Sequence, residues 1–202
     1  MKSSENTDVK KKRIGLYSGS FNPIHLGHTK LAEYVVDNKL VDEVWFVVSP
    51  CNPLKKQSEL LNEYIRLEMT ILAISNHSNF KVSDVEFCMP IPSYSIDTLE
   101  LLSSQFTDCQ FSLIIGSDNA LIFDHWKDYS LLLEKYPVLV YPRTGLNFEL
   151  MSDKYPEMKL LNSPVYDISS TQIRNFIAQK MDASQWLHPS VYQFIVENDF
   201  YQ

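Results

Sequence analysis

Short apolar runs recur along the chain and predict the strands of a buried sheet. We expect strands over residues 13–17, 43–48, 80–83, 111–115 and 138–141, with a weaker one over 159–161. The runs at 43–48 and 111–115 are almost continuously apolar instead of alternating with polar residues. Unbroken runs of this kind are typical of parallel strands that are covered by helices on both faces.

Longer amphipathic stretches between these runs predict helices. They cover residues 27–38, 62–74, 95–104, 130–135, 170–178 and 190–198. The alternation predicts an α/β fold: a single doubly wound, mostly parallel sheet of the Rossmann-like type, with a C-terminal helical portion. Such folds bind ligands at the carboxyl ends of the strands, where the strand order reverses. We expect one domain over residues 12–202, preceded by a polar, disordered N-terminus over residues 1–11.

Composition narrows the class of protein. The chain has 202 residues, enough for one domain with a full core, and a formal net charge of −7. An acidic chain lacks the basic surface of a nucleic-acid-binding protein, so we expect no nucleic-acid partner. The sequence has no apolar run long enough to span a membrane, so we expect no membrane association. Its three cysteines are odd in number and lack metal-ligand spacing, which favours reduced thiols in a cytoplasmic protein. The sequence leaves open whether a homo-oligomer forms.

The segment at 19–28, with the sequence GSFNPIHLGH, is the strongest candidate for a functional site. It joins a predicted strand to a predicted helix through small and turn-forming residues. The first N–H groups of a helix are unpaired and its dipole is positive there, so such a turn can bind an anion. His25 and His28 face the same way and would add donors. Two exposed histidines on a solvated helix face are the simpler alternative, and the segment matches neither a Walker A loop nor a GxGxxG motif.

The segment at 168–174, with the sequence ISSTQIR, begins the helix predicted at 170–178. A run of hydroxyl residues at a helix start is first of all a capping signal. The same hydroxyls and the free N–H groups of the helix would also cradle a phosphate. Arg174 lies one turn into the helix, where its guanidinium could reach an anion.

Two other segments could bind an anion. In 49–56 two prolines stiffen a loop that carries Lys55 and Lys56. This loop either delivers a cation to a phosphate or is only solvated. The segment 92–99 begins a helix, and its first turn either is capped by a serine or binds a carboxylate or phosphate.

A glycine and an aromatic residue complete the set of candidates. Gly116 follows the strand at 111–115 and would let a ligand approach the backbone. Asp118 would accept hydrogen bonds from a ribose or a ring amide, or would cap the next helix. Trp126 would stack on a flat ring, although a partly buried structural tryptophan is the commoner outcome.

The segments at 19–28 and 168–174 resemble the two signatures of nucleotidyltransferases related to class I aminoacyl-tRNA synthetases. Within that superfamily the chain is most similar to the bacterial nicotinate-nucleotide adenylyltransferase family, because 50–55, 92–99, 114–118 and Trp126 also match. The resemblance implies a Rossmann-like nucleotidyltransferase fold and a reaction. ATP and nicotinate mononucleotide would give nicotinate adenine dinucleotide and pyrophosphate, by direct in-line attack and without an enzyme-bound intermediate.

The resemblance also implies roles for residues. The expected catalytic residues are His25, His28, Lys55 and Arg174. The expected ATP-binding residues are Gly19, Ser20, Phe21, Asn22, Gly116, Asp118, Ile168, Ser169, Ser170 and Arg174. The expected nicotinate mononucleotide-binding residues are Asn52, Tyr94, Ser95, Asp118 and Trp126. Mg²⁺ would be carried with ATP, and we expect no protein metal ligands.

Departures from the family pattern are small. The turn reads Gly-Ser-Phe-Asn where many relatives have Gly-Thr-Phe-Asp, so a hydroxyl and a short polar residue are kept. Lys55 and Lys56 replace a commoner His-Lys or His-Arg pair, which leaves open which lysine reaches phosphate. The competing hypotheses are a sister transferase acting on another phosphate, a nucleotide sensor without catalysis, and an RNA-charging fragment. The short acidic chain argues against the last of these.

Overall fold

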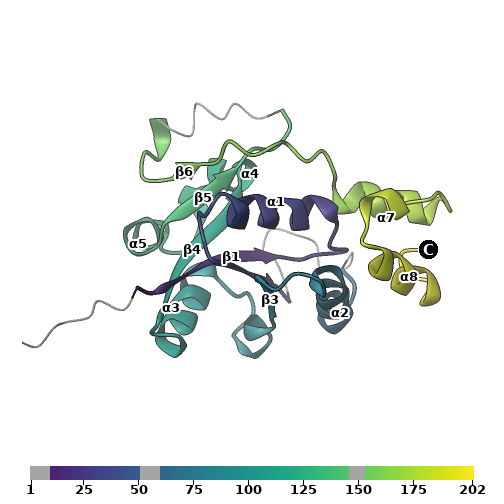
Figure 1. Cartoon of the computed structure of the whole chain (residues 1–202), viewed down its shortest axis with the longest axis horizontal. Coiled ribbons are helices and arrows are strands. Elements are labelled where there is room, and N and C mark those ends of the chain that lie inside the picture. Colours follow the sequence, from purple (N-terminus) through teal and green to yellow (C-terminus); the bar gives the residue numbers. More distant parts are fainter. Residues whose placement is uncertain (1–9, 51–59, 146–152) are drawn as a thin grey trace, which may run out of the picture.

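The computed structural model describes residues 10–50, 60–145 and 153–202. Its centre is a six-stranded sheet in the order β3-β2-β1-β4-β5-β6, with every neighbouring pair parallel (Figure 1). The strands are β1 (Lys12–Gly19), β2 (Glu43–Val48), β3 (Phe80–Ser83), β4 (Cys109–Gly116), β5 (Val138–Tyr141) and β6 (Lys159–Leu160). The strand order reverses between β1 and β4, which is the switch point of a doubly wound sheet. The predicted fold class is confirmed.

Helices cover both faces of this sheet (Figure 1). They are α1 (Leu26–Asp37), α2 (Glu63–Ile74), α3 (Ser95–Gln105), α4 (Ser117–Leu121), α5 (Tyr129–Lys135), α7 (Ser170–Ala178) and α8 (Pro189–Glu197). Shorter 3₁₀ helices are η2 (Val85–Cys88), η3 (Phe123–His125) and η4 (Ser184–Trp186). Side chains fix several starts: the Asn62 side chain accepts a hydrogen bond from the Tyr64 N–H, and Ser169 and Gln172 form a reciprocal capping box.

The core divides into two hydrophobic clusters, one on each face of the sheet. Residues of α1, α2, α7 and α8 pack against Phe46 and Val48 of β2. Residues of α3 and α5 pack against Trp45 and Val47 of the same strand. Because both faces of β2 are covered, all six of its residues are buried, which is why its sequence is continuously apolar apart from Glu43.

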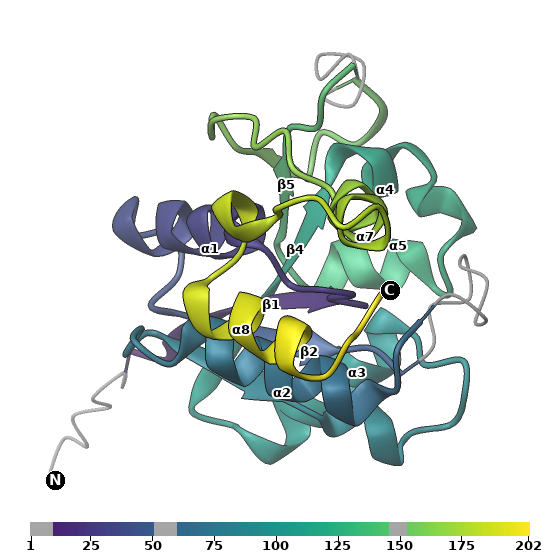
Figure 2. The same cartoon turned by 90° about the vertical axis from the view of Figure 1, so that its right-hand side faces the viewer.

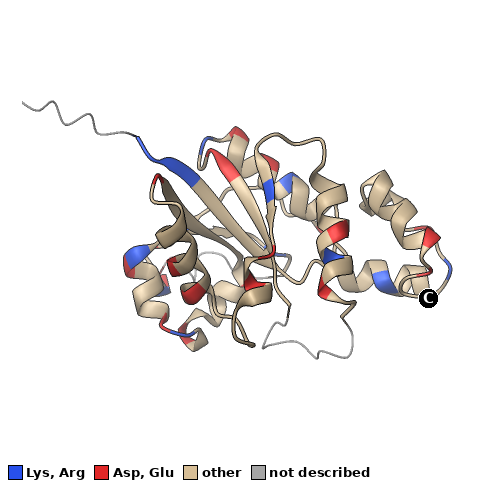
Figure 3. Cartoon of the chain, turned by 90° about the horizontal axis from the view of Figure 1, so that it is seen from below, with Lys and Arg blue, Asp and Glu red and all other residues tan. Residues whose placement is uncertain are grey.

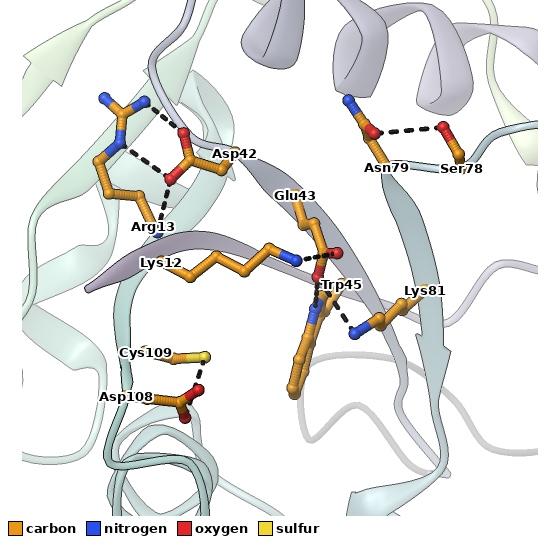
Figure 4. Close-up of polar contacts among 10 residues, drawn as sticks. All are labelled: Lys12, Arg13, Asp42, Glu43, Trp45, Ser78, Asn79, Lys81, Asp108 and Cys109. Carbon is orange, nitrogen blue, oxygen red and sulfur yellow. Dashed lines mark hydrogen bonds and ion pairs between the residues drawn. The ribbon is translucent and has the colours of Figure 1, made fainter. Parts of the chain in front are cut away.

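Ion pairs hold the amino ends of the strands together (Figure 4). Glu43 pairs with Lys12 and with Lys81, and it accepts a hydrogen bond from the Trp45 indole at 3.1 Å. Asp42 accepts hydrogen bonds from Arg13 at 2.6 and 2.9 Å, and this guanidinium and backbone N–H lower the pKa of Asp42 to about 2. Figure 3 shows the basic start of β1 at the opposite end of the molecule from α7 and α8. These contacts join β1 to β2 and β2 to β3 at their amino ends. They do not involve the carboxyl ends of the strands.

Each predicted strand and helix is present, with shifts of a few residues at the ends. The structure adds α4 and the three 3₁₀ helices, which are too short to give a periodic pattern. Residues 1–9 of the predicted polar N-terminus lie outside the described residues. Over the described ranges, no helix is both long and apolar enough to cross a membrane.

Candidate active site

A cavity of about 630 Å³ opens at the carboxyl ends of β1 and β4. It lies at the switch point of the sheet, where this fold binds ligands. The structure brings together here most of the residues that the sequence singled out: Gly19, Ser20, Phe21, Asn22, His25, His28, Tyr94, Ser95, Gly116, Asp118, Trp126, Ser169, Ser170 and Arg174. Ile168 packs instead against the hydrophobic core, and Asn52 and Lys55 lie outside the described residues.

The turn after β1 has an unusual backbone conformation. Phe21 has a φ of +43°, a left-handed value that is costly for a bulky side chain. Its ring is buried edge-on against Tyr17, with centroids 5.8 Å apart. Arg66 of α2 is fully buried and donates to the Ser20 carbonyl at 2.6 Å and to the Ser49 carbonyl at 2.7 Å. A buried guanidinium therefore fixes the turn from behind and joins it to the end of β2.

The two histidines are stacked at the start of α1, with ring centroids 3.7 Å apart. His28 Nδ1 accepts a hydrogen bond from the His25 backbone N–H at 3.2 Å, so the proton of a neutral His28 ring is on Nε2. His25 is only 5% exposed. Burial, followed by the positive charge of Arg143, lowers the pKa of His25 to about 3. His25 is therefore a neutral imidazole near pH 7.

Two polar atoms beside this turn have no hydrogen-bond partner within the described part of the chain. They are Ser20 Oγ and His25 Nδ1, and both are buried. Buried polar groups are nearly always paired, with protein, water or a ligand. Both residues line the cavity, so their orphaned atoms indicate a polar ligand there.

The start of α7 docks directly onto the turn. Ser170 Oγ donates to the Pro23 carbonyl at 2.9 Å, and Arg174 Nη1 donates to the Asn22 carbonyl at 3.0 Å. Ser169 caps the helix by accepting a hydrogen bond from the Gln172 N–H at 3.2 Å. The two segments that the sequence marked, about 150 positions apart, thus form adjoining walls of one cavity.

A second part of the cavity is aromatic. Tyr94 is the N-cap of α3, and Trp126 packs against Phe123 with ring centroids 5.1 Å apart. The Lys127 ammonium lies 5.1 Å from the centre of the Tyr94 ring and is held at 2.8 Å by both oxygens of Asp97. A flat ring between these aromatics would meet a lysine and the free N–H groups at the start of α3.

Between the two parts, Arg143 lies beside the carboxyl end of β4. Its Nη2 donates to the Tyr141 hydroxyl at 2.9 Å, and its Nε lies 3.6 Å from Asp118 Oδ1. A Cβ atom on Gly116 would come within 2.3 Å of that same carboxylate oxygen. Gly116 therefore has to be a glycine for Asp118 and Arg143 to approach each other as they do.

Comparison with known proteins decides the family. Residues 16–176 match the family described as cytidylyltransferase-like. The chain is 43% identical over 187 residues to a protein of Bacteroides fragilis named "Probable nicotinate-nucleotide adenylyltransferase", covering 93% of this chain and 92% of that one. A protein of the same name from Flavobacterium johnsoniae is 41% identical, covering 94% and 99%. The chain belongs to the nicotinate-nucleotide adenylyltransferase family.

Solved structures agree on the fold of this nicotinate-nucleotide adenylyltransferase family. One is described as Plasmodium falciparum nicotinic acid mononucleotide adenylyltransferase complexed with NaAD. It superposes with a TM-score of 0.81 at 23% identity, covering 94% of this chain and 97% of that one. A second structure of the Plasmodium protein, complexed with APC, gives a TM-score of 0.79.

Sequence reasoning missed several residues of this nicotinate-nucleotide adenylyltransferase-family site. Glu86, in η2, is buried and accepts hydrogen bonds from Ser93 at 2.7 Å and Thr98 at 3.0 Å, which hold the start of α3. Arg66 lies on α2, and Arg143 lies two residues after the end of β5. The position of Arg143 just after a strand was a signal that could have been used, whereas Glu86 and Arg66 look like ordinary charged residues in the sequence.

The acidic residues that line the cavity do not form a metal cage. Glu86 is engaged by Ser93 and Thr98, and Asp118 faces Arg143. Among the residues that the structure describes, no three His, Cys, Asp or Glu side chains are grouped to hold an ion. Mg²⁺ usually keeps several waters and binds through substrate phosphates, so it needs no such group to arrive with ATP.

Proposed function

We propose that the protein transfers the adenylyl group of ATP to nicotinate mononucleotide, giving nicotinate adenine dinucleotide and pyrophosphate in NAD biosynthesis. One observation carries the proposal: the turn at 19–28 and the segment at 168–174 touch each other around a single cavity. Membership of the nicotinate-nucleotide adenylyltransferase family supports it, as do the names of relatives about 40% identical.

The chemistry requires positioning more than proton transfer. A phosphate oxygen of the mononucleotide bonds to the α-phosphorus of ATP, while the bond from that phosphorus to pyrophosphate breaks. The attacking phosphate is already an anion, so no general base is needed. The protein has to hold two anions together and stabilise the charge on the transferring group. Correct orientation alone contributes on the order of 7–11 kcal/mol.

The phosphate side of the cavity supplies donors for this work. His25 and His28 would give N–H groups to the ATP phosphates, His25 as a neutral ring because its pKa is about 3. The start of α7 would bind the phosphates from the other side through the N–H groups of its first turn and the Arg174 guanidinium. The Ser169 and Ser170 hydroxyls donate to Gln172 and Pro23 and so shape this wall of the site. Lys55 stays a predicted additional cation, since it lies outside the described residues.

The aromatic side of the cavity suits the pyridine ring. Trp126 would stack on it, beside Tyr94 and Ser95. The free N–H groups at the start of α3 favour a carboxylate over an amide, because an amide also needs an acceptor for its own N–H groups. Lys127 adds a positive charge at the same place. We therefore expect the acid, nicotinate mononucleotide, to be preferred.

Magnesium would arrive on the ATP phosphates and keep water ligands, because the described carboxylates of the cavity already have partners. When bound, it neutralises part of the phosphate charge.

We place the reaction in the cytoplasm, since Cys88 and Cys109 are free thiols, as expected in a reducing compartment.

The deciding experiment is a pyrophosphate-release assay with ATP and Mg²⁺. Nicotinate mononucleotide, nicotinamide mononucleotide, pantetheine phosphate and glycerol phosphate are compared as acceptors, and CTP replaces ATP in a parallel set. Fastest release with ATP and nicotinate mononucleotide supports the proposal. Faster release with another acceptor would identify a sister transferase, and ATP binding without any release would identify a nucleotide sensor.

A further inference from the structure

The end of the chain returns to the phosphate turn. The Tyr201 hydroxyl donates to Asn22 Oδ1 at 2.8 Å, across 179 positions of sequence. Figure 2 shows the segment after α8 running back beside α7. Asn22 is 3% exposed and lines the cavity, whereas Tyr201 is not among the described residues that line it. Tyr201 thus contacts the site from behind, through Asn22.

The backbone near Tyr201 is held in an unfavourable conformation. Asp199 has a φ of +53° and Tyr201 a φ of +66°, left-handed values that residues with side chains rarely adopt. At Asp199 this value belongs to the C-terminal cap of α8, a common way for a helix to end. Phe200, between them, packs edge-on against Phe194 at 5.6 Å and donates its N–H to the Ile195 carbonyl at 3.1 Å. These contacts keep the segment on α8 and direct the Tyr201 ring to the turn.

Asn22 accepts hydrogen bonds from three separate segments of the chain. Its side-chain oxygen accepts from the Leu61 N–H at 3.3 Å as well as from Tyr201, and its carbonyl accepts from Arg174 at 3.0 Å. Because a backbone N–H can only donate, these bonds define which side of the Asn22 carboxamide is oxygen. Burial raises the pKa of Tyr201, so its hydroxyl stays protonated and remains a donor.

We propose that Tyr201 is a positioning residue, which holds the Asn22 carboxamide and thereby sets the 19–22 turn to receive the ATP phosphates. This inference rests on the proposed function insofar as ATP is the ligand of the turn. The hydroxyl does not touch the substrate; it acts by keeping Asn22 in one orientation. Without it, Asn22 Oδ1 loses the shorter of its two described hydrogen bonds, and the 3.3 Å bond from Leu61 stays.

The test compares Tyr201→Phe with Tyr192→Phe. Tyr192 lies on α8, and its hydroxyl is near Asp182 instead of the turn, so it is the control for loss of a tyrosine hydroxyl in the same part of the chain. ATP binding is measured by calorimetry without the second substrate, and steady-state kinetics give KM for each substrate. We expect Tyr201→Phe to weaken ATP binding about fivefold, the effect of one lost hydrogen bond, and to leave KM for nicotinate mononucleotide unchanged. Tyr192→Phe should bind ATP as the unmodified protein does.

A double-mutant cycle tests whether Tyr201 acts through Asn22. In an Asn22→Ala background, Tyr201→Phe should have no further effect on ATP affinity. Three results would overturn the proposal: unchanged ATP affinity in Tyr201→Phe, an equal loss in Tyr192→Phe, or losses that multiply in the Asn22→Ala background. If the unmodified protein binds ATP but releases no pyrophosphate, the proposed function fails, and the ATP affinities still decide the role of Tyr201. If it binds no ATP, both proposals fail.

Discussion

The buried histidine of the phosphate turn makes stability depend on pH in a calculable way. The pKa of His25 is about 3 in the folded protein against an ordinary value of 6.5, because burial disfavours the charged ring and Arg143 repels it. Between these two values the unfolded chain binds the proton and the folded chain does not. The folded state is therefore destabilised as pH falls below about 6.5, and the loss continues down to about pH 3.

The size of this effect follows from the same two pKa values. From pH 7 to pH 5 the unfolded state gains about 2 kcal/mol from protonation of this one residue, while the folded state gains almost nothing. The assay is urea denaturation of the ligand-free protein and of His25→Gln at both pH values. All other titratable groups are present in both proteins and cancel in the difference. The unmodified protein should lose about 2 kcal/mol more than the variant between pH 7 and pH 5.

His77→Gln is the control for this measurement. His77 lies at the surface, 3.7 Å from Glu33, and reports what removal of an accessible histidine does to the pH dependence. Equal losses of stability in the unmodified protein and in His25→Gln would refute the reasoning, because they would mean that His25 protonates as readily in the folded protein as in the unfolded chain. The result also bears on the proposed reaction, because a neutral His25 would offer phosphate a hydrogen bond and no positive charge.

The remaining predictions concern the reaction and the substrate. His28→Ala should lower kcat about 10²–10³-fold, as for one lost transition-state donor, and near-normal turnover of a folded variant would remove it from the mechanism. Gly116→Ala should lower the free energy of unfolding by only about 1 kcal/mol, measured by thermal unfolding, and raise KM for ATP, because the new Cβ would displace the flexible Asp118 carboxylate. Lys127→Met should reduce the preference for nicotinate over nicotinamide mononucleotide about two- to fivefold, because a partly exposed charge contributes only modestly to the binding free energy. Lys135→Met is the control, because it removes an ion pair between Lys135 and Glu100 of α3, away from the cavity. An equal change of substrate preference in this variant would rule out a local effect of Lys127.

The fold was predictable because its signals are local. Unbroken apolar strands such as 43–48 and capped helices such as 170–178 carry their own pattern, and strand-helix alternation then dictates a parallel sheet. Helix ends were less certain: Asn62, predicted as helical, is the N-cap of α2. The pattern of apolar and polar residues is the same on both sides of such a boundary. Only the hydrogen bond from the Tyr64 N–H to the Asn62 side chain shows that Asn62 is the cap and not part of the helix.

The site was predictable where its residues are contiguous in the sequence. The histidines of 19–28 and the hydroxyls of 168–174 stand out because turn, cap and charge occur together. Arg66, Glu86 and Tyr201 do not stand out, since each acts on a segment brought to it only by tertiary folding. Their contacts are with carbonyls, hydroxyls and an amide, which leave no recognisable spacing along the chain.

The contacts between α7 and the phosphate turn have a consequence for synthesis on the ribosome. A nascent chain that has reached residue 160 contains all the strands of the sheet and both histidines. It still lacks the hydroxyl that Ser170 gives to Pro23 and the guanidinium that Arg174 gives to Asn22. The nucleotide site is therefore assembled only when the helices that follow the sheet have been translated. Products truncated before α7 would lack this wall of the site and also the core residues Ile173 and Ile177.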